Sequence, residues 1–98
     1  MRRIESVGFE NFEWDDAKSL QVLAQREIDF LQVASALLEP HLSSESDKQG
    51  EARTLAVCMV GSQIVRVVYT IRDSRCRIIT AMAARRDERK RYRDIFGG

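Results

Sequence analysis

Hydrophobic and polar positions alternate most clearly in the C-terminal half of the chain. Two runs rich in β-branched residues, 64–71 and 77–82, flank the polar segment 73–75. Val, Ile, Tyr and Thr fit a pleated, half-buried surface, so the pattern predicts two neighbouring antiparallel strands joined by a tight turn. Alternation sorts the first run into two faces. The apolar face carries Val65, Val67, Tyr69 and Ile71, and the face with guanidinium groups carries Arg66, Val68, Thr70 and Arg72.

Two segments before these strands have the spacing of amphipathic helices. Asp15 is suited to cap the first helix, which extends to about Arg26 and repeats Ala17, Leu20, Leu23 and Ala24 along one side. Asp29 caps the second helix in a capping box with Gln32, and Pro40 stops it. The buried stripe of the second helix is predicted to contain Val33, Ala34, Leu37 and Leu38.

The remaining segments complete an α+β arrangement. Residues 9–14 alternate weakly and predict a short edge strand. Residues 54–60 predict another strand, which a Gly-containing hairpin joins to the run at 64–71, and a basic helix begins near residue 84. The predicted order is β-α-α-β-β-β-α, a small antiparallel sheet packed with helices on one side. We expect a single domain spanning residues 1–98.

These elements separate the positions expected to be exposed from those expected to be buried. Residues 41–50 are polar and lack periodicity, so they predict a mobile loop with His41 exposed in it. One hydrophobic core is expected elsewhere. It is predicted to combine Leu20, Leu23, Val33 and Leu37 of the helices with Val57, Met59, Val65, Val67, Tyr69, Ile71 and Ile79 of the strands.

Charge divides the chain into two unlike parts. Residues 64–98 contain ten Lys and Arg against four Asp and Glu, whereas residues 1–63 contain six against eleven, so a net charge of +6 is joined to one of −5. Such an asymmetry points to an anionic partner, and nucleic acid is the commonest partner of a basic patch. The alternative is a solvated helix face whose charges keep the protein soluble.

Composition excludes several classes of protein. Cys58 and Cys76 have no CxxC spacing and no neighbouring His, so they predict neither a zinc site nor a disulfide framework. We expect both thiols to be buried in a protein of the reducing cytoplasm. No apolar run approaches the roughly 20 residues of a membrane span, so no membrane contact is expected. Nothing in the sequence predicts a cofactor or a metal.

Several short motifs occur together between Phe12 and Tyr92. They are Phe12-Glu13-Trp14-Asp15-x-Ala17-Lys18, Glu39-Pro40, Glu51-x-Arg53, Val68-Tyr69-Thr70-x-Arg72, and Arg77-Ile78-Ile79-Thr80-Ala81 before Ala84-x3-Glu88-Arg89-x2-Tyr92. With these motifs the chain resembles the BrnT family of type II toxin–antitoxin toxins over nearly its whole length. The resemblance implies a RelE-like fold and a ribonuclease activity that arrests growth.

The resemblance also implies partners. The substrate would be RNA. A BrnA-type ribbon-helix-helix antitoxin would neutralise the toxin, in a heterotetramer, and would itself bind operator DNA. Operator DNA would therefore be contacted only through the antitoxin.

The chain departs from the family pattern at two places. The family usually has Asn, then Lys-His-Gly, at the end of its first helix, where this chain has Val22 and Gln25-Arg26-Glu27. After the last strand the family usually has an Arg, where this chain has Met82. Arg26 could replace part of the missing charge. The loss of Gly at Glu27 removes the residue that most readily takes left-handed geometry, so either the helix ends differently or the toxin is weakened.

Cleavage of RNA requires removal of the 2′-hydroxyl proton, stabilisation of charge on the phosphorane, and protonation of the 5′-oxygen. Preformed positive groups usually contribute most to such a reaction. Because the chain has one His, a two-histidine mechanism is excluded, and an arginine-rich site remains. Arg72 matches the family pattern and is the best candidate to hold the scissile phosphate. The candidate catalytic residues are Lys18, Arg26, Arg72, Arg77 and Arg85.

Each assignment has a plainer alternative. A single Arg can be a surface charge at a strand end. Glu88 could act as a base, but we expect it to be a structural partner of nearby arginines. Trp14 and Phe12 could stack on bases, but we expect them to pack the first strand, and we expect Tyr92 in the core.

At the level of function, the leading interpretation is a ribonuclease toxin. The runner-up is a module that binds the antitoxin but has lost the chemistry, which the departures at Met82 and Gln25-Arg26-Glu27 favour. A DNA-binding regulator is a weak third, because no helix-turn-helix or ribbon-helix-helix pattern occurs.

Overall fold

The computed structural model describes residues 2–4, 11–48 and 51–97. Its elements in chain order are β1 (Arg2–Ile4), β2 (Asn11–Trp14), α1 (Asp16–Arg26), α2 (Phe30–Leu37), β3 (His41–Lys48), β4 (Glu51–Val60), β5 (Gln63–Arg72), β6 (Arg75–Ala83) and α3 (Arg86–Phe96). The predicted α+β class is confirmed, and so is the predicted order, which β2, α1, α2, β4, β5, β6 and α3 follow. β1 and β3 are additions to that order.

Six strands form one sheet in the order β1-β3-β4-β5-β6-β2 within the described residues. Strands β3 to β6 form an antiparallel meander, and β1 is also antiparallel to its neighbour β3. β2 is an edge strand, as predicted, but it joins β6 in parallel. Residues 9 and 10 of the predicted edge strand lie outside the described residues.

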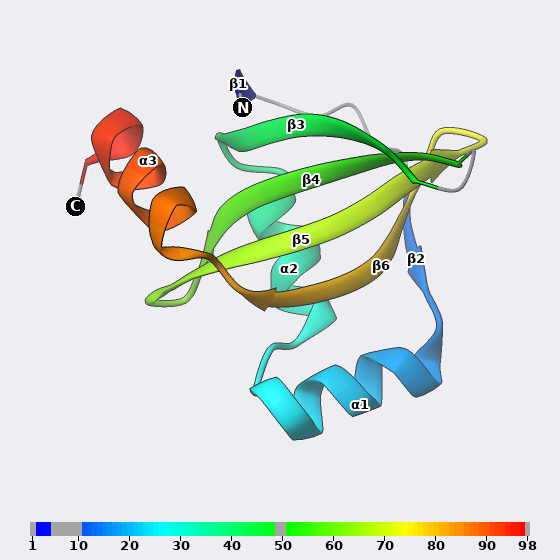
Figure 1. The fold of residues 1–98 in the computed structure, drawn as a ribbon. Coiled ribbons are helices and arrows are strands. Elements are labelled where there is room, and N and C mark those ends of the chain that lie inside the picture. Colours follow the sequence, from blue (N-terminus) through cyan, green and yellow to red (C-terminus); the bar gives the residue numbers. More distant parts are fainter. Residues whose placement is uncertain (1, 5–10, 49–50, 98) are drawn as a thin grey trace.

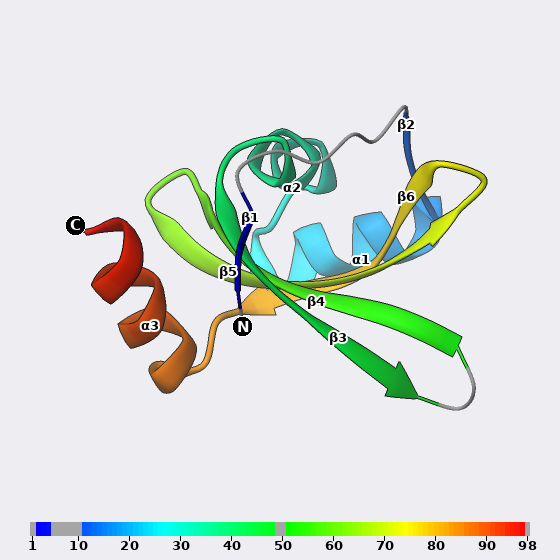
Figure 2. The same cartoon turned by 90° about the horizontal axis from the view of Figure 1, so that it is seen from above.

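The helices cover the two faces of the sheet unequally. α1 contacts β6, and α2 contacts β4 and β6. Both helices lie on one side of the sheet, whereas α3 follows β6 to the end of the sheet near the β4–β5 turn (Figures 1 and 2). We call the side of α1 and α2 the helix-covered face. The other side, toward which Arg66, Val68, Thr80 and Met82 point, is the open face.

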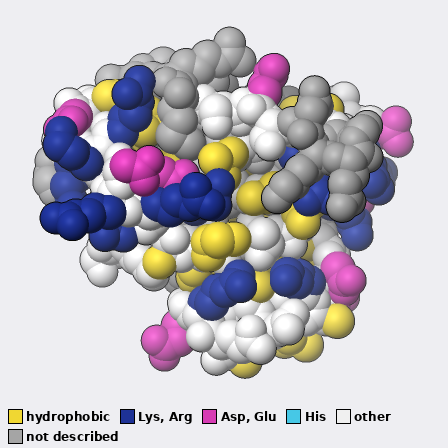
Figure 3. Space-filling model, viewed as in Figure 1, with side chains coloured by type: hydrophobic (Ala, Val, Ile, Leu, Met, Phe, Trp, Pro, Cys, Tyr) yellow, Lys and Arg dark blue, Asp and Glu magenta, His cyan; other side chains and the backbone are white. Residues whose placement is uncertain are grey.

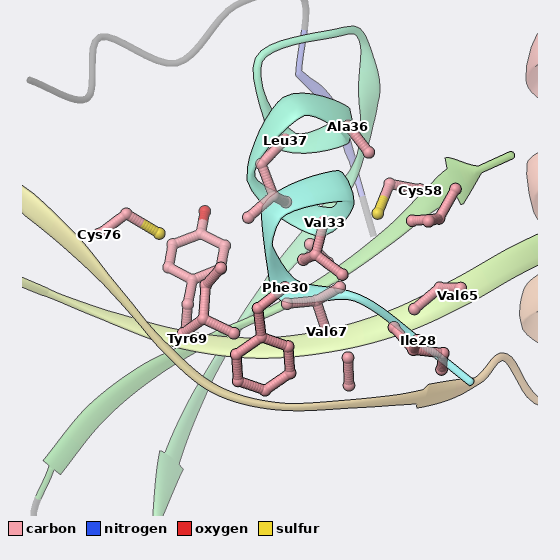
Figure 4. Packing of buried hydrophobic residues seen from close by; sticks show 14 of the residues in the cluster. Ile28, Phe30, Val33, Ala36, Leu37, Cys58, Val65, Val67, Tyr69 and Cys76 are labelled. Atoms are coloured by element: carbon pink, nitrogen blue, oxygen red, sulfur yellow. The ribbon is translucent and has the colours of Figure 1, made fainter. Parts of the chain in front are cut away.

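The main hydrophobic core lies between α2 and the helix-covered face. Phe30, Val33 and Leu37 of α2 meet Val65, Val67 and Tyr69 of β5, and all six are buried (Figure 4). Trp14 packs edge-on against Phe30, with ring centroids 6.0 Å apart. The predicted packing roles of Trp14 and of the apolar face of residues 64–71 are therefore confirmed, except at Ile71, which is exposed.

A second, smaller cluster closes one end of the open face. It contains Leu42, Val57 and Ile64 of three neighbouring strands, with Ala84 and Tyr92 of the α3 region above them. Phe96 packs against Tyr92, with ring centroids 4.7 Å apart. The predicted core position of Tyr92 is confirmed, and this cluster anchors α3 to the sheet.

The helix boundaries follow local capping chemistry. The Asp15 carboxylate accepts a hydrogen bond from the Ala17 backbone N–H at 2.9 Å, and the Asp29 carboxylate accepts one from the Leu31 N–H at 2.9 Å, so both predicted caps are confirmed. The Asp29 bond goes to Leu31 and not to Gln32 of the predicted capping box. α1 ends at Arg26 because Glu27 takes the left-handed conformation, with φ 57° and ψ 35°. A glutamate therefore occupies the geometry that normally favours Gly.

The loop predicted at residues 41–50 is wrong. Residues 41–48 form β3, which pairs with β4 from Leu42 to Lys48, while residues 49 and 50 lie outside the described residues. His41 is not exposed but fully buried, with Nδ1 2.7 Å from the Glu39 carbonyl oxygen. Pairing with β4 provides hydrogen bonds for the backbone N–H and C=O groups of residues 42–48, whatever their side chains are. The periodicity of side chains cannot reveal such pairing.

The predicted core was also wrong in two elements. In α1 the buried side chain is Val22, and Leu20 and Leu23 are exposed. In β4 the residues that face the main core are Ala56 and Cys58, because they pair with Val67 and Val65. Val57 consequently belongs to the cluster under α3, and Met59 is exposed.

Leu38, predicted in the buried stripe of the second helix, is also exposed. The last error in the predicted core is at Ile79. The pairing of β5 with β6 shifts register between Val68 and Tyr69, so that Val68 pairs with Thr80 but Tyr69 pairs with Ile78. Ile79 has no partner in this ladder and is only half-buried, and Ile78 takes the core position. An irregularity of this kind depends on strand pairing, which a period-two pattern does not contain.

Candidate functional site

The open face contains a hollow of about 270 Å³ beside α3. Figure 3 views this face, where hydrophobic side chains in the middle are surrounded by Lys and Arg. Four neighbouring strands contribute to it. The lining residues are Ser46, Arg53, Thr54, Leu55, Arg66, Val68, Thr80 and Met82. The hollow combines two guanidinium groups, hydroxyl groups and an apolar floor, and no carboxylate occurs among the lining side chains that the structure describes.

Arg66 and Met82 lie directly opposite each other across β5 and β6. Residues paired in this way point to the same face, with Cβ atoms about 5 Å apart. Val68 and Thr80 form the next pair on the same face. A methionine thioether has no hydrogen-bond donor, so Arg66 provides the positive charge at this pair of positions.

Glu88 connects Arg66 to the start of α3. Its Oε2 lies 3.2 Å from the Arg66 Nε, and its Oε1 accepts a hydrogen bond from the Arg85 backbone N–H at 2.9 Å. Both side chains are largely shielded, at 19% exposure for Arg66 and 8% for Glu88. The expected role of Glu88 as a structural partner is therefore observed, although its cationic partner is Arg66 on β5.

Arg72 and Arg77 come together at the hairpin end of the same sheet. Arg72 is opposite Arg75, and Arg77 is opposite Thr70, so all of them start from the open-face side of the β5–β6 arm. Arg72 is exposed and Arg77 is half-buried. At about 3.3 Å per residue, the path along β5 from Arg66 to Arg72 is about 20 Å. Arg72 is thus at a distance from the Arg66 end of the hollow, although the other end, at Thr54, is opposite Tyr69 of the same strand.

Lys18 and Arg77 line a second hollow, of about 280 Å³, together with Asp15, Ile78 and Ile79. It lies where the first turn of α1 meets β6. The pairing of β2 with β6, in which Glu13 is opposite Arg77, brings the start of α1 to this position. Lys18 and Arg77 therefore form a second basic position near the Asp15 carboxylate, which caps α1.

Arg26 reaches the hollow beside α3 from the opposite direction. Its Nη1 donates to the Ala81 carbonyl oxygen at 2.9 Å and to the Thr80 hydroxyl oxygen at 3.2 Å. Thr80 lines that hollow, so α1 places a third guanidinium at its rim. Arg85, at the cap of α3, is exposed, and its backbone is held by Glu88. None of the five predicted residues is among the lining residues named above; Arg26 is connected to the hollow through Thr80, and the Arg85 backbone through Glu88.

Arg53 and Arg66 line the hollow but were not among the predicted site residues. A signal for Arg66 existed, because the alternation in residues 64–71 placed it on the face with guanidinium groups. Arg53 was part of the motif Glu51-x-Arg53, but it was given no role. The predicted strand began only at residue 54, so the sequence pattern did not show which face Arg53 would take.

Titratable groups of the helix-covered side are held uncharged by burial. Burial lowers the pKa of His41, against a smaller raising effect of its hydrogen bond to Glu39. Burial also raises the pKa of Cys58 and that of Cys76 to about 12 each, so these thiols are inert, as their expected burial implied. Among the described residues, no cluster of three or more His, Cys, Asp or Glu side chains could hold a metal ion.

Another hollow, of about 500 Å³, is chemically different. It lies between α2 and the β4–β5 turn, and the described residues that line it include Leu31, Met59 and Glu39 but no Lys or Arg. These residues offer no cation that would attract phosphate. Among the described residues, the longest helices have 11 residues, about half of what a membrane-crossing helix requires.

Comparison with known families identifies residues 14–88 with the family described as "Ribonuclease toxin, BrnT, of type II toxin-antitoxin system". The matched region begins with Trp14 in β2 and ends at Glu88 in α3, so it contains both hollows with basic linings. No curated protein and no solved structure matches the chain. The match covers most of the 98 residues and agrees with the motifs in the sequence, and the chain therefore belongs to the BrnT family of ribonuclease toxins of type II toxin–antitoxin systems.

Proposed function

We propose that this protein is an endoribonuclease that binds RNA along the open face of its sheet and cleaves it to arrest growth. The observation that carries the proposal is the hollow beside α3, in which Arg53 and Arg66 lie above an apolar floor with Arg26 at the rim. A shaped, partly shielded basic surface suits a phosphate better than a solvated helix face does.

The proposed reaction breaks the bond between phosphorus and the 5′-oxygen. The 2′-oxygen attacks the adjacent phosphorus, its proton is removed, and a proton is delivered to the departing 5′-oxygen, which leaves a 2′,3′-cyclic phosphate. Guanidinium groups stabilise the negative charge that develops on the phosphorane oxygens, which is usually the largest contribution. Proton transfers add about 10²–10⁴-fold where a suitable group is within reach.

In this proposal one basic position binds the RNA backbone and the other acts on the phosphate that is cleaved. Arg72 and Arg77, with Lys18 near the start of α1, hold the RNA backbone along the β5–β6 arm. Arg66 and Arg26 act at the hollow, with Arg85 beside it. Both oxygens of Glu88 already have partners, which favours a positioning role over that of a base.

The protein partner in this proposal is a BrnA-type ribbon-helix-helix antitoxin, bound as a heterotetramer in the cytoplasm. Membership of a type II toxin–antitoxin family implies a protein antitoxin. Exposed leucines, Leu20 and Leu23 on α1 and Leu31 on α2, offer apolar area for such a partner. Operator DNA would be contacted through the antitoxin alone.

A second candidate function is a non-catalytic module that only binds the antitoxin. One observation favours it, namely that Met82 lines the hollow and has no donor for a phosphate oxygen. The two functions differ in whether the isolated chain cleaves RNA.

The test is to express the chain alone, and together with its antitoxin, and to measure growth and RNA cleavage. We expect toxicity that the antitoxin relieves. We expect Arg72→Ala to abolish toxicity while antitoxin binding remains, because Arg72 is exposed at the hairpin and its loss leaves the core unchanged. Met82→Arg should raise cleavage by up to about 10²–10³-fold, the usual contribution of one well-placed donor, without raising stability.

A different outcome would decide for the second candidate. If the wild-type chain cleaves no RNA, and Met82→Arg does not change this although the variant folds and binds the antitoxin, the enzyme proposal is wrong. The chain would then be an antitoxin-binding module. Thermal unfolding of each variant provides the control for folding.

A further inference from the structure

We propose that Arg66 is the guanidinium that contacts the phosphate in the hollow, and that Glu88 is the residue that positions it. This inference rests on the proposed function and assigns the central phosphate contact to two residues. It follows from which nitrogen of Arg66 is engaged, from the register of β5 with β6, and from the place where α3 begins.

The ion pair leaves part of the Arg66 guanidinium available. Its Nε is buried and lies 3.2 Å from the Glu88 Oε2, an ion-pair contact without hydrogen-bond geometry, and no hydrogen bond from its terminal nitrogens to a described residue is observed. Arg66 lines the hollow and is 19% exposed, so these terminal nitrogens are the accessible donors. A guanidinium held at Nε can still present a two-nitrogen fork, which matches two oxygens of one phosphate.

Glu88 is built into the fold more firmly than a surface carboxylate. It is the third residue of α3, and its Oε1 accepts the backbone N–H of Arg85 at 2.9 Å, which fixes the carboxylate against the helix start. α3 is itself anchored through Tyr92 in the cluster with Val57 and Ile64. The carboxylate therefore has one orientation, and it transmits that orientation to Arg66.

The pairing of Arg66 with Met82 identifies a second position from which a guanidinium group can enter the same hollow. Arg66 and Met82 are opposite each other on one face, so their side chains start about 5 Å apart. A guanidinium placed at residue 82 can reach the space that Arg66 serves. A shared phosphate position predicts that Met82→Arg gains more activity in the Arg66→Met background than in the wild type, whereas a purely structural role of Arg66 predicts no such difference.

The experiment measures RNA cleavage by the purified full chain in a two-by-two set: wild type, Arg66→Met, Met82→Arg, and the double variant. Arg66→Met should lower kcat by about 10²–10³-fold, the usual loss for one well-placed donor. The double variant should recover at least about tenfold of that loss, because the guanidinium returns on the neighbouring strand. Arg91→Met, an exposed arginine of α3 that lines neither basic hollow, is the matched control and should keep wild-type activity.

Glu88 is tested by a change that keeps its cap. In Glu88→Gln the amide oxygen can still accept the Arg85 N–H, but the charge that orients Arg66 is lost. Because a misplaced group can cost up to about 100-fold, we expect kcat to fall by that order while KM changes little. Arg66→Met leaves a shielded carboxylate without its partner, so Arg66→Met/Glu88→Gln, which removes both charges, serves as the variant that preserves folding.

The outcomes separate this inference from the proposed function. If the wild type cleaves RNA but folded Arg66→Met or Arg66→Met/Glu88→Gln is as active as the control, the assignment of Arg66 is wrong while the enzyme remains. If the double variant Arg66→Met/Met82→Arg is folded and no more active than Arg66→Met, the shared phosphate position is wrong. If the wild type itself cleaves no RNA, the proposed function fails and the assignment with it.

Discussion

The two faces of the sheet differ in how they treat charge. On the helix-covered face, α2 buries Phe30, Val33 and Leu37 against β5, and the titratable groups among them are kept neutral. On the open face, α3 covers only one end, and the remaining area holds guanidinium groups, of which Arg66 is paired with Glu88. The same strands serve both faces because successive side chains point in opposite directions.

This difference indicates how a chain of 98 residues can hold both a core and a basic site. Removing water from an uncompensated charge costs free energy, so the helix-covered face, which holds the main core, excludes charged groups or keeps them neutral. The open face retains charge by leaving it partly hydrated or by pairing it. We therefore expect substitutions on one face to change stability and substitutions on the other to change RNA binding and cleavage.

The largest effect on stability is expected at two adjacent leucines that differ in burial, the last residue of α2 and its C-cap. Leu37 is 0% exposed and Leu38 is 50% exposed. Leu37→Ala should lower the free energy of unfolding by about 2–5 kcal/mol, whereas Leu38→Ala should cost less than about 1 kcal/mol. Denaturant unfolding measures both. Equal costs would mean that α2 does not pack as the helix-covered face requires.

The open face should respond to salt instead. If RNA binding neutralises three phosphates, the logarithm of the affinity should fall with a slope of about −2 against the logarithm of salt concentration, so about 20-fold is lost between 50 and 200 mM. Arg72→Ala should reduce the slope by about 0.7. Binding to a single-stranded RNA in a salt titration is the measurement. A flat response would leave the arginines as solubilising charges.

His41 should give the helix-covered side a dependence on pH. Burial lowers its pKa in the folded protein, so the unfolded chain takes up a proton first when the pH falls below about 6.5. Its contribution to stability is complete above that pH and is lost below it, at up to about 1.4 kcal/mol per pH unit.

The comparison variant for this pH dependence is His41→Asn, whose amide can still donate to the Glu39 carbonyl but does not titrate. Denaturant unfolding between pH 5 and pH 7, as an order-of-magnitude window around the ordinary His pKa, should show a flatter profile for the variant. Identical slopes for both proteins would assign the acid sensitivity to other groups.

The smallest expected effect is at the turn that joins α1 and α2. Glu27 holds a left-handed conformation with φ 57°. Glu27→Gly should raise the free energy of unfolding by about 1 kcal/mol, because Gly takes this geometry without a Cβ penalty. Glu27→Ala is the control, since it removes the charge but keeps the Cβ, and it should bring no such gain. A gain with Ala alone would point to charge as the cause.

The sequence by itself determined the elements whose signals are local. Asp15 and Asp29 cap their helices through their own side chains, and the alternation from Val65 to Tyr69 describes which side chains β5 buries. The family motifs likewise lie within single elements or beside them. Local hydrogen bonds and period-two burial are properties of a few consecutive residues, so a single sequence contains them.

Only the tertiary structure decided which segments pair and which side chains share a hollow. β3 is a strand because its backbone pairs with β4, and His41 is buried although most of the segment that follows it is polar. Ala56 and Cys58 face the core because of their partners on β5. Arg66 and Glu88 meet because α3 starts where β6 ends and folds back over β5. These contacts join residues far apart in the chain, and their free energy depends on a register that no local pattern records.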